Sequence, residues 1–128
     1  MKKIFFFLIL FLVITSLPAC KIEENYAMQG VFTHELAAQS SVIAKDKKLT
    51  VEVPIADFSC NIDSFETFLE RQRDTFIVTL VGDETEERCE VNFTGTISEI
   101  QTGDYWVKVI YKKGDEEQEL LFKEFFMN

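Results

Sequence analysis

The chain has 128 residues, of which 47% are hydrophobic and 27% charged, and its 22 acidic and 13 basic side chains give a formal net charge of −9. This length fits a single domain. Because an acidic surface repels phosphate groups, the charge argues against a nucleic-acid partner.

The first 20 residues have the pattern of an export signal that ends on a cysteine. Two lysines precede an apolar run over residues 4–14, which is too short for a bilayer span of about 20 residues. The run leads to Leu17-Pro18-Ala19-Cys20, which resembles the lipobox of bacterial lipoproteins. The resemblance implies that residues 1–19 are a signal peptide and that the thiol of Cys20 is diacylated after cleavage. The alternative is an ordinary signal peptide cleaved near Ala19, with Cys20 left as a free thiol.

A lipidated Cys20 would anchor the protein to a membrane, because two or more acyl chains give stable attachment. Residues 20–29 show no periodicity, and we interpret them as a lipidated tether that leads to a folded domain over residues 30–128. Without the leader, 11 basic residues remain against 22 acidic ones, a formal charge of −11. Lys21 follows Cys20 at the place where an Asp resembles the inner-membrane retention signal of Gram-negative lipoproteins. We therefore expect the bacterial cell envelope, at the outer membrane.

Beyond the tether, apolar residues alternate with polar ones, which is the period of half-buried β-strands. The apolar phase of the last strand consists of Leu120, Phe122 and Phe126. Phe58 and Cys60 follow the opposite phase from the run before them, which predicts a bulge around residues 54–57. The predicted strands cover residues 49–55, 76–80, 89–93, 105–111 and 120–126.

Glycine and charged residues mark the connections. Residues 82–88 and 113–117 each join two alternating runs, so we expect hairpins and antiparallel neighbours. Asp63 followed by Glu66 has the spacing of a helix cap, and three apolar residues then recur at spacings of three and four. This pattern predicts one short helix over residues 64–72.

About seven short antiparallel strands predict an all-β sandwich or a small barrel. Within the segment 97–109, Ile100, Gly103 and Tyr105 stand where immunoglobulin-like domains of bacterial surface lipoproteins have a hydrophobic residue, a glycine turn and a tyrosine entering the penultimate strand. The segment therefore resembles the final strands of those domains. The resemblance implies a single antiparallel immunoglobulin-like β-sandwich, and the short helix departs from its plainest form.

Two cysteines, Cys60 and Cys89, remain in the part of the chain that leaves the cytoplasm. An even pair in an oxidising compartment favours a disulfide. The alternatives are two free buried thiols, or a catalytic or metal site. The only histidine, His34, has no cysteine near it in the sequence and no recognisable nucleophile motif, so we expect no enzyme, no metal and no cofactor.

Two further groups of residues are candidates for binding. Carboxylates at positions 83, 84, 86 and 87 could hold calcium, although a solvated hairpin tip explains them more simply. Trp106, Lys108, Ile110 and Lys112 lie on the opposite phase from Tyr105, so they form either a candidate contact surface or a second covered face.

These features predict a lipid-anchored binding or assembly module without catalysis, which presents a rigid domain to an envelope protein or a glycan. The alternative is a periplasmic inhibitor of a cationic hydrolase such as lysozyme, which the acidity of the chain would suit.

Overall fold

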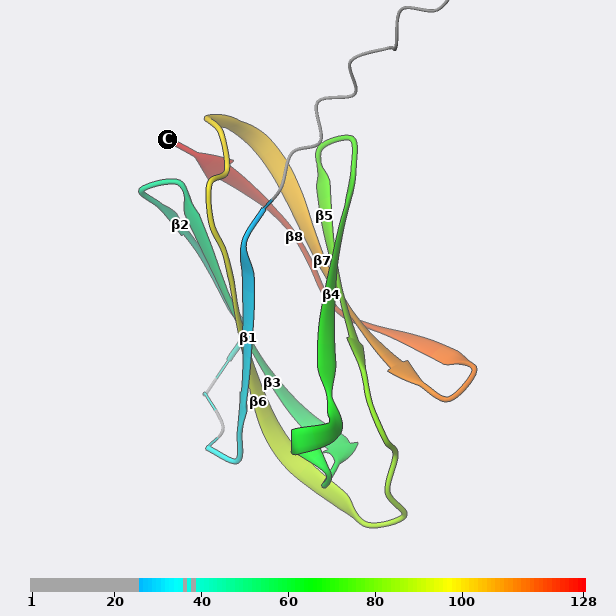
Figure 1. The fold of residues 1–128 in the computed structure, drawn as a ribbon. Coiled ribbons are helices and arrows are strands. Elements are labelled where there is room, and N and C mark those ends of the chain that lie inside the picture. The colour runs from blue at the N-terminus through cyan, green and yellow to red at the C-terminus, as the bar shows by residue number, and fades with distance from the viewer. Residues whose placement is uncertain (1–25, 36, 38) are drawn as a thin grey trace, which may run out of the picture.

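The computed structural model describes residues 26–35, 37 and 39–128 (Figure 1). The predicted signal peptide, Cys20 and the predicted tether up to residue 25 lie outside the described residues, so the expected lipidation stays a prediction. None of the described residues belongs to a helix long and apolar enough to cross a membrane.

The described residues form eight strands and one 3-10 turn. Valine, isoleucine, threonine and phenylalanine are frequent in the strands, as suits a pleated and half-buried surface. In chain order the elements are β1 (Met28–Thr33), β2 (Ser41–Lys45), β3 (Lys48–Ser59), the 3-10 turn η1 (Ile62–Ser64), β4 (Glu66–Gln72), β5 (Thr75–Val81), β6 (Arg88–Ile97), β7 (Gly103–Lys113) and β8 (Glu116–Met127).

The strands form two four-stranded sheets, which lie as two layers in Figure 1. Sheet A has the order β1-β6-β3-β2, and sheet B has the order β4-β5-β7-β8. The expected all-β fold is therefore confirmed. Strands β5 and β7 pair in parallel, from Thr75 opposite Trp106 to Leu80 opposite Tyr111. The expectation of purely antiparallel pairing is wrong for this pair, because β6 comes between them in the chain but belongs to the other sheet.

One hydrophobic core lies between the sheets. Alternate residues of β3 and β6 in sheet A, and of β5 and β7 in sheet B, are almost completely buried. Burial of each large apolar side chain contributes about 1.5–3 kcal/mol to stability. The largest fully buried side chains include Phe58, Phe76, Phe93 and Tyr111.

Strand β4 occupies the place of the helix predicted over residues 64–72. Thr67 and Leu69 are partly buried and alternate with the exposed Phe68 and Glu70, which is the period of a strand. The strand pairs antiparallel with β5 through a tight turn in which Arg73 has a φ of 56°. The predicted helix is wrong because Phe68, three residues after the buried Phe65, is exposed on the opposite face, whereas Leu69, four residues after Phe65, faces the core as it would in a strand.

The connections differ partly from the prediction. Residues 113–117 form the β7–β8 hairpin as expected, but residues 82–88 carry the chain from sheet B to sheet A and do not form a hairpin. The register of β3 shifts between Ile55 and Phe58, where the bulge was predicted. Strand β1 begins at Met28, so Met28 and Gln29 belong to the sheet and not to the tether.

Cys60 and Cys89 form the predicted disulfide, with their Cα atoms 5.0 Å apart. The bond joins the end of β3 to the start of β6, two neighbouring strands of sheet A. Both cysteines are half-buried. The disulfide therefore fastens the two strands at the end where the β5–β6 loop enters sheet A (Figure 1).

Candidate functional site

The outer face of sheet B carries exposed aromatic side chains on regular strands. The register of the strands defines rows of neighbouring residues that run across the sheet. Phe68 shares one row with Ile110, the next row contains Lys108 opposite Phe122, and the row after that contains Trp106. Phe126 lies opposite Asp104 at the end of β8. These aromatic side chains are exposed, with Trp106 at 39% and Phe126 at 56%. We call Phe68, Trp106, Phe122 and Phe126 the aromatic face.

Trp106 and Phe122 form the centre of the aromatic face. Their ring centroids lie 4.9 Å apart with an interplanar angle of 27°, so the rings are stacked. The Nζ of Lys108 lies 5.0 Å from the centroid of Phe122, within cation–π range. The two contacts hold the Phe122 ring in place although 49% of the side chain is exposed.

The candidate contact surface read from the sequence lies on this face. Trp106 and Lys112 are exposed, and Lys108 and Ile110 are half-buried. Because sheet A covers the other side of sheet B only, no second layer lies over these residues among those that the structure describes.

The phenylalanines of the aromatic face were missed for two reasons. Phe68 belongs to the segment predicted as a helix. Phe122 and Phe126 were expected in the apolar phase of the last strand, but Phe125 and Met127 are the buried residues there. The register of β7 and β8 shifts between Val109 and Ile110. The run of apolar residues in β8 gives no unambiguous phase, so only the pairing with β7 decides which side faces outward.

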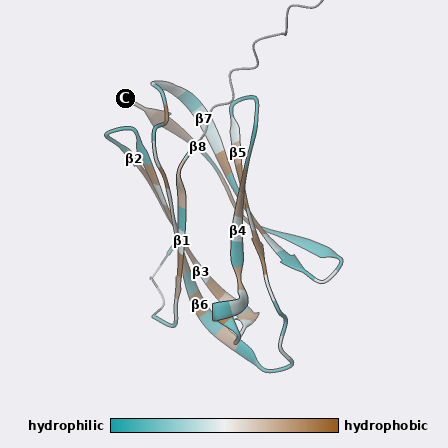
Figure 2. Ribbon diagram, viewed as in Figure 1, coloured by the Kyte–Doolittle hydropathy of each residue, from teal (hydrophilic) through white to brown (hydrophobic). Residues whose placement is uncertain are grey.

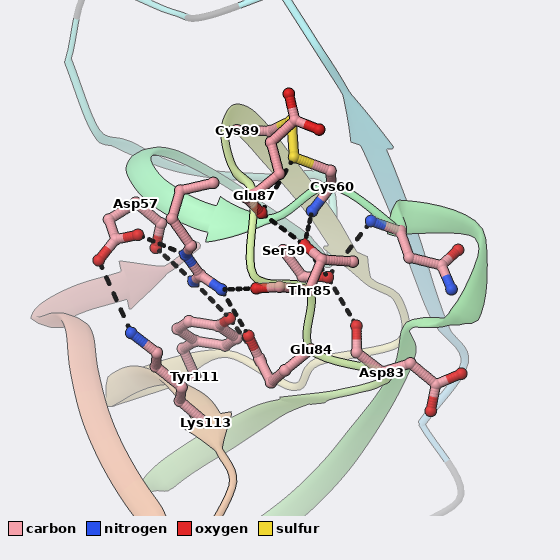
Figure 3. A network of polar contacts seen from close by, with 12 residues as sticks. Asp57, Ser59, Cys60, Asp83, Glu84, Thr85, Glu87, Cys89, Tyr111 and Lys113 are labelled. Carbon is pink, nitrogen blue, oxygen red and sulfur yellow. Dashed lines mark hydrogen bonds and ion pairs between the residues drawn. A yellow bond between two sulfur atoms is a disulfide. The ribbon is translucent and has the colours of Figure 1, made fainter.

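A polar network centred on Arg88 holds the β5–β6 loop at the disulfide end of the molecule (Figure 3). The Nε of Arg88 donates to Asp57 Oδ1 at 2.5 Å, and its Nη1 donates to Glu84 Oε2 at 2.8 Å. Its Nη2 donates to the hydroxyl of Tyr111 at 3.1 Å, and this hydroxyl donates to Glu84 Oε1 at 2.5 Å. The network therefore joins β3, the loop, β6 and β7 across both sheets.

The network shifts the pKa values of its members. The hydrogen bond from Arg88 lowers the pKa of Asp57 below its usual value. Burial, followed by the hydrogen bond to Glu84, raises the pKa of Tyr111. The hydrogen bond to Glu84 is the main cause of a raised pKa of Arg88. Arg88 therefore stays protonated and Tyr111 neutral at ordinary pH.

Two hydroxyl groups fix the backbone of the same loop. Ser59 Oγ donates to the carbonyl of Asp83 at 2.6 Å. The amide of Cys60 donates to Thr85 Oγ1 at 2.9 Å, and this hydroxyl donates to the carbonyl of Glu87 at 2.6 Å (Figure 3). The hairpin expected for this segment is wrong, because the loop carries the chain to sheet A and is fastened to the end of β3 by hydrogen bonds beside the disulfide. The side chains of Asp83, Glu86 and Glu87 are exposed, as expected for a solvated segment.

The carboxylates of this loop do not form a metal site. Glu84 turns toward Arg88 and Tyr111, and only 27% of its side chain is exposed. In the part of the chain that the structure describes, no three histidine, cysteine, aspartate or glutamate side chains come together in a way that could hold a metal ion. His34 lies exposed in the bend after β1.

Comparison with known proteins gives no further guide to the site. No family model, curated protein or solved structure matches the chain. The aromatic face and the fastened loop are thus the two features on which a functional argument can rest.

Proposed function

We propose that this protein is a lipid-anchored binding or assembly module of the bacterial cell envelope, without catalysis, that binds its partner through the outer face of sheet B. The observation that carries the proposal is the stacked Trp106–Phe122 pair, which stands exposed on regular strands. Tryptophan and other aromatic residues are enriched in the centres of protein interfaces and in ligand-binding surfaces.

The rigidity of the face supports binding. Its residues lie on strands and not on loops, and the core beneath β5 and β7 is fully packed. A contact surface of this kind loses little conformational entropy when a partner binds. The membrane attachment rests on the resemblance of Leu17-Pro18-Ala19-Cys20 to a lipobox, and we propose the outer membrane as its location.

We also propose that the fold is a variant of the immunoglobulin-like sandwich. The hydroxyl of Tyr105, at the start of the penultimate strand, donates to the carbonyl of Gln101 at 2.9 Å. Immunoglobulin-like domains have a tyrosine corner of this form at the corresponding strand. The parallel pairing of β5 with β7 departs from the antiparallel sheets of those domains.

A matched pair of variants tests the proposed binding face. Trp106→Ser with Phe122→Ser removes the stacked pair, while Val31→Ser with Ile43→Ser removes two apolar residues of sheet A that are slightly more exposed. Each protein, expressed as the full chain and purified in detergent, is immobilised and incubated with envelope extract. We expect the wild type and the Val31/Ile43 variant to retain the same envelope components. The Trp106/Phe122 variant should no longer retain them. Equal retention by all three proteins would refute the proposed face.

A second candidate, an inhibitor of a cationic hydrolase such as lysozyme, draws support from the loop over residues 82–88. The loop presents the exposed carboxylates of Asp83, Glu86 and Glu87 on a backbone that the disulfide and the hydroxyls of Ser59 and Thr85 hold fixed. Lysozyme inhibition by the wild type tests this candidate. If the variant Glu86→Lys with Glu87→Lys loses this inhibition and the Trp106/Phe122 variant keeps it, the inhibitor is favoured over binding through sheet B.

A further inference from the structure

On the outer face of sheet B most carboxylates lie on the two edge strands, whereas apolar and aromatic residues lie on all four strands. The outward positions of the central strands β5 and β7 hold threonine, isoleucine, valine and tryptophan, together with Lys108 near the middle of β7 and Asp104 and Lys112 near its ends. The outward positions of the two edge strands hold most of the carboxylates. These are Glu66 and Glu70 on β4, and Glu117, Glu119 and Glu124 on β8.

The two lysines do not cancel this pattern. Lys108 places its ammonium group over the ring of Phe122, and Lys112 lies directly opposite Glu117. Each basic side chain thus has an attractive neighbour within the face. The outward carboxylates of β4 and β8 lie about 15 Å apart across the face, as the spacing of four strands implies. Ile77, Trp106 and Ile110 lie between them, so the face has an apolar centre between two margins of negative charge.

The outer face of sheet A shows that the separation does not follow from the acidity of the chain alone. Its outward positions include threonines and the exposed apolar residues Val31 and Ile43, with Glu52 and Glu90 balanced by Lys45 and Lys48. Aromatic residues and unbalanced carboxylates therefore gather on one of the two faces. Figure 2, coloured by hydropathy, shows further polar segments at the β5–β6 loop, at the tip of the β7–β8 hairpin, and at the turns between β2 and β3 and between β4 and β5.

We propose that the outer face of sheet B docks a basic protein whose contact surface is apolar at its centre and carries lysine or arginine at its margins. The proposal rests on the proposed binding function and names the class of partner. Protein interfaces commonly combine an apolar, aromatic centre with a polar rim. Complementary charge at the rim speeds association and selects the partner.

The charge of the face also argues against three other occupants, and a fourth, a glycan, would gain nothing from it. A second copy of the chain would bring its acidic margins against those of the first, which like-charge repulsion opposes. An anionic lipid surface or nucleic acid would meet the same repulsion. A glycan would match the aromatic rings but would gain nothing from the carboxylates at both margins of an apolar centre.

Photo-cross-linking in the cells that naturally produce the protein tests the proposal. A photoreactive phenylalanine derivative replaces Gln72, which lies exposed in the row of Trp106, and in a control chain it replaces Gln29, which lies exposed on sheet A. The adduct is identified by mass spectrometry. We expect a basic protein as the partner cross-linked from position 72 and not from position 29.

Charge reversal makes the test specific for the partner class. Glu70→Lys with Glu124→Lys reverses one charge at each margin, and Glu86→Lys with Glu90→Lys makes the same change in net charge away from the face. We expect the first pair to lower the adduct yield from position 72 about tenfold, and the second pair to change it by less than about twofold.

The outcomes separate this inference from the function on which it rests. An acidic or neutral partner, an adduct of two copies of the chain, or a yield that charge reversal leaves unchanged would overturn the inference and keep the binding face. Trp106 is the only tryptophan of the chain, so its fluorescence reports on the face directly. A shift of its emission with soluble peptidoglycan fragments, without a protein adduct, would assign the face to a glycan and overturn the inference. Absence of any adduct and of any fluorescence change would overturn both.

Discussion

Removal of the disulfide should cost a large part of the stability of this domain. Cys60 and Cys89 are 29 residues apart in the sequence, and the loop that they close contains the whole of β4 and β5. The chain-entropy model assigns about 3.6 kcal/mol to closing a loop of this length. For a domain of about 100 residues this corresponds to a fall in Tm of about 15 °C. We expect this change in the variant Cys60→Ala with Cys89→Ala.

Thermal unfolding followed by circular dichroism measures the effect. The wild type in reducing buffer should unfold close to the temperature of the Cys60/Cys89 variant, because both lack the cross-link. Cys20→Ser serves as a control that removes a cysteine but keeps the disulfide, and it should unfold like the wild type. A difference below about 1 kcal/mol between the oxidised wild type and the Cys60/Cys89 variant would refute the reasoning, since the cross-link would then not restrict the unfolded chain.

Three further predictions concern single positions. Tyr111→Phe should lower the free energy of unfolding by about 1–2 kcal/mol in urea titrations, because its hydroxyl bonds two charged side chains. Since the pKa of Tyr111 is raised in the folded state, the wild type should lose stability as the pH rises above about 10. The Phe variant lacks the titrating hydroxyl, so the share of this loss that comes from Tyr111 should be absent. Gly82→Ala should lower the free energy of unfolding by about 1–3 kcal/mol, because its Cβ would lie 2.5 Å from Cδ2 of Phe65. Gly114→Ala should lower it by only about 1 kcal/mol, because a Cβ there meets no atom within 4 Å and only the left-handed backbone opposes alanine. Cys20→Ser should abolish labelling by a radioactive fatty acid, and label retained by the variant would contradict the lipobox.

The sequence predicts the strands well where one face is buried and the other is polar. The runs around Val51, Phe76, Val91 and Val107 have this alternation, and each becomes a strand with its apolar side in the core. The bulge before Phe58 can be predicted from the same alternation, because one extra residue in a strand reverses which of the following residues face the core. The disulfide followed from the number of cysteines and from the export signal.

The pattern fails where both faces of a strand carry apolar residues. In β4, Phe68 is exposed and Leu69 is half-buried, so the two adjacent apolar residues imitate a helical stripe. In β8, Phe125 and Phe126 give no preferred phase until β7 pairs with them. Three of the four residues of the aromatic face lie in these two strands, so the sequence located Trp106 but not the phenylalanines around it.

The pairing of strands could not be predicted from local signals. A loop such as residues 82–88 can return the chain within a sheet or carry it to the other layer, and its glycine and charged residues suit both routes. The network of Arg88 with Glu84 and Tyr111 exists only because the loop crosses between the layers. These contacts join residues 4 and 27 positions apart in the sequence, which no motif connects.

The connectivity of the two sheets has a consequence for export. Strand β1 is hydrogen-bonded along β6 alone, with Met28 opposite Ile97, and β5 is joined to β8 only through β7. If the chain is exported as we propose and emerges with its N-terminus first, the β2–β3 and β4–β5 hairpins can form early, but neither sheet can be completed until the C-terminal third has followed. Until then the hairpins have unpaired edges that could join other chains, so the last strands to cross the membrane are the ones that protect the first.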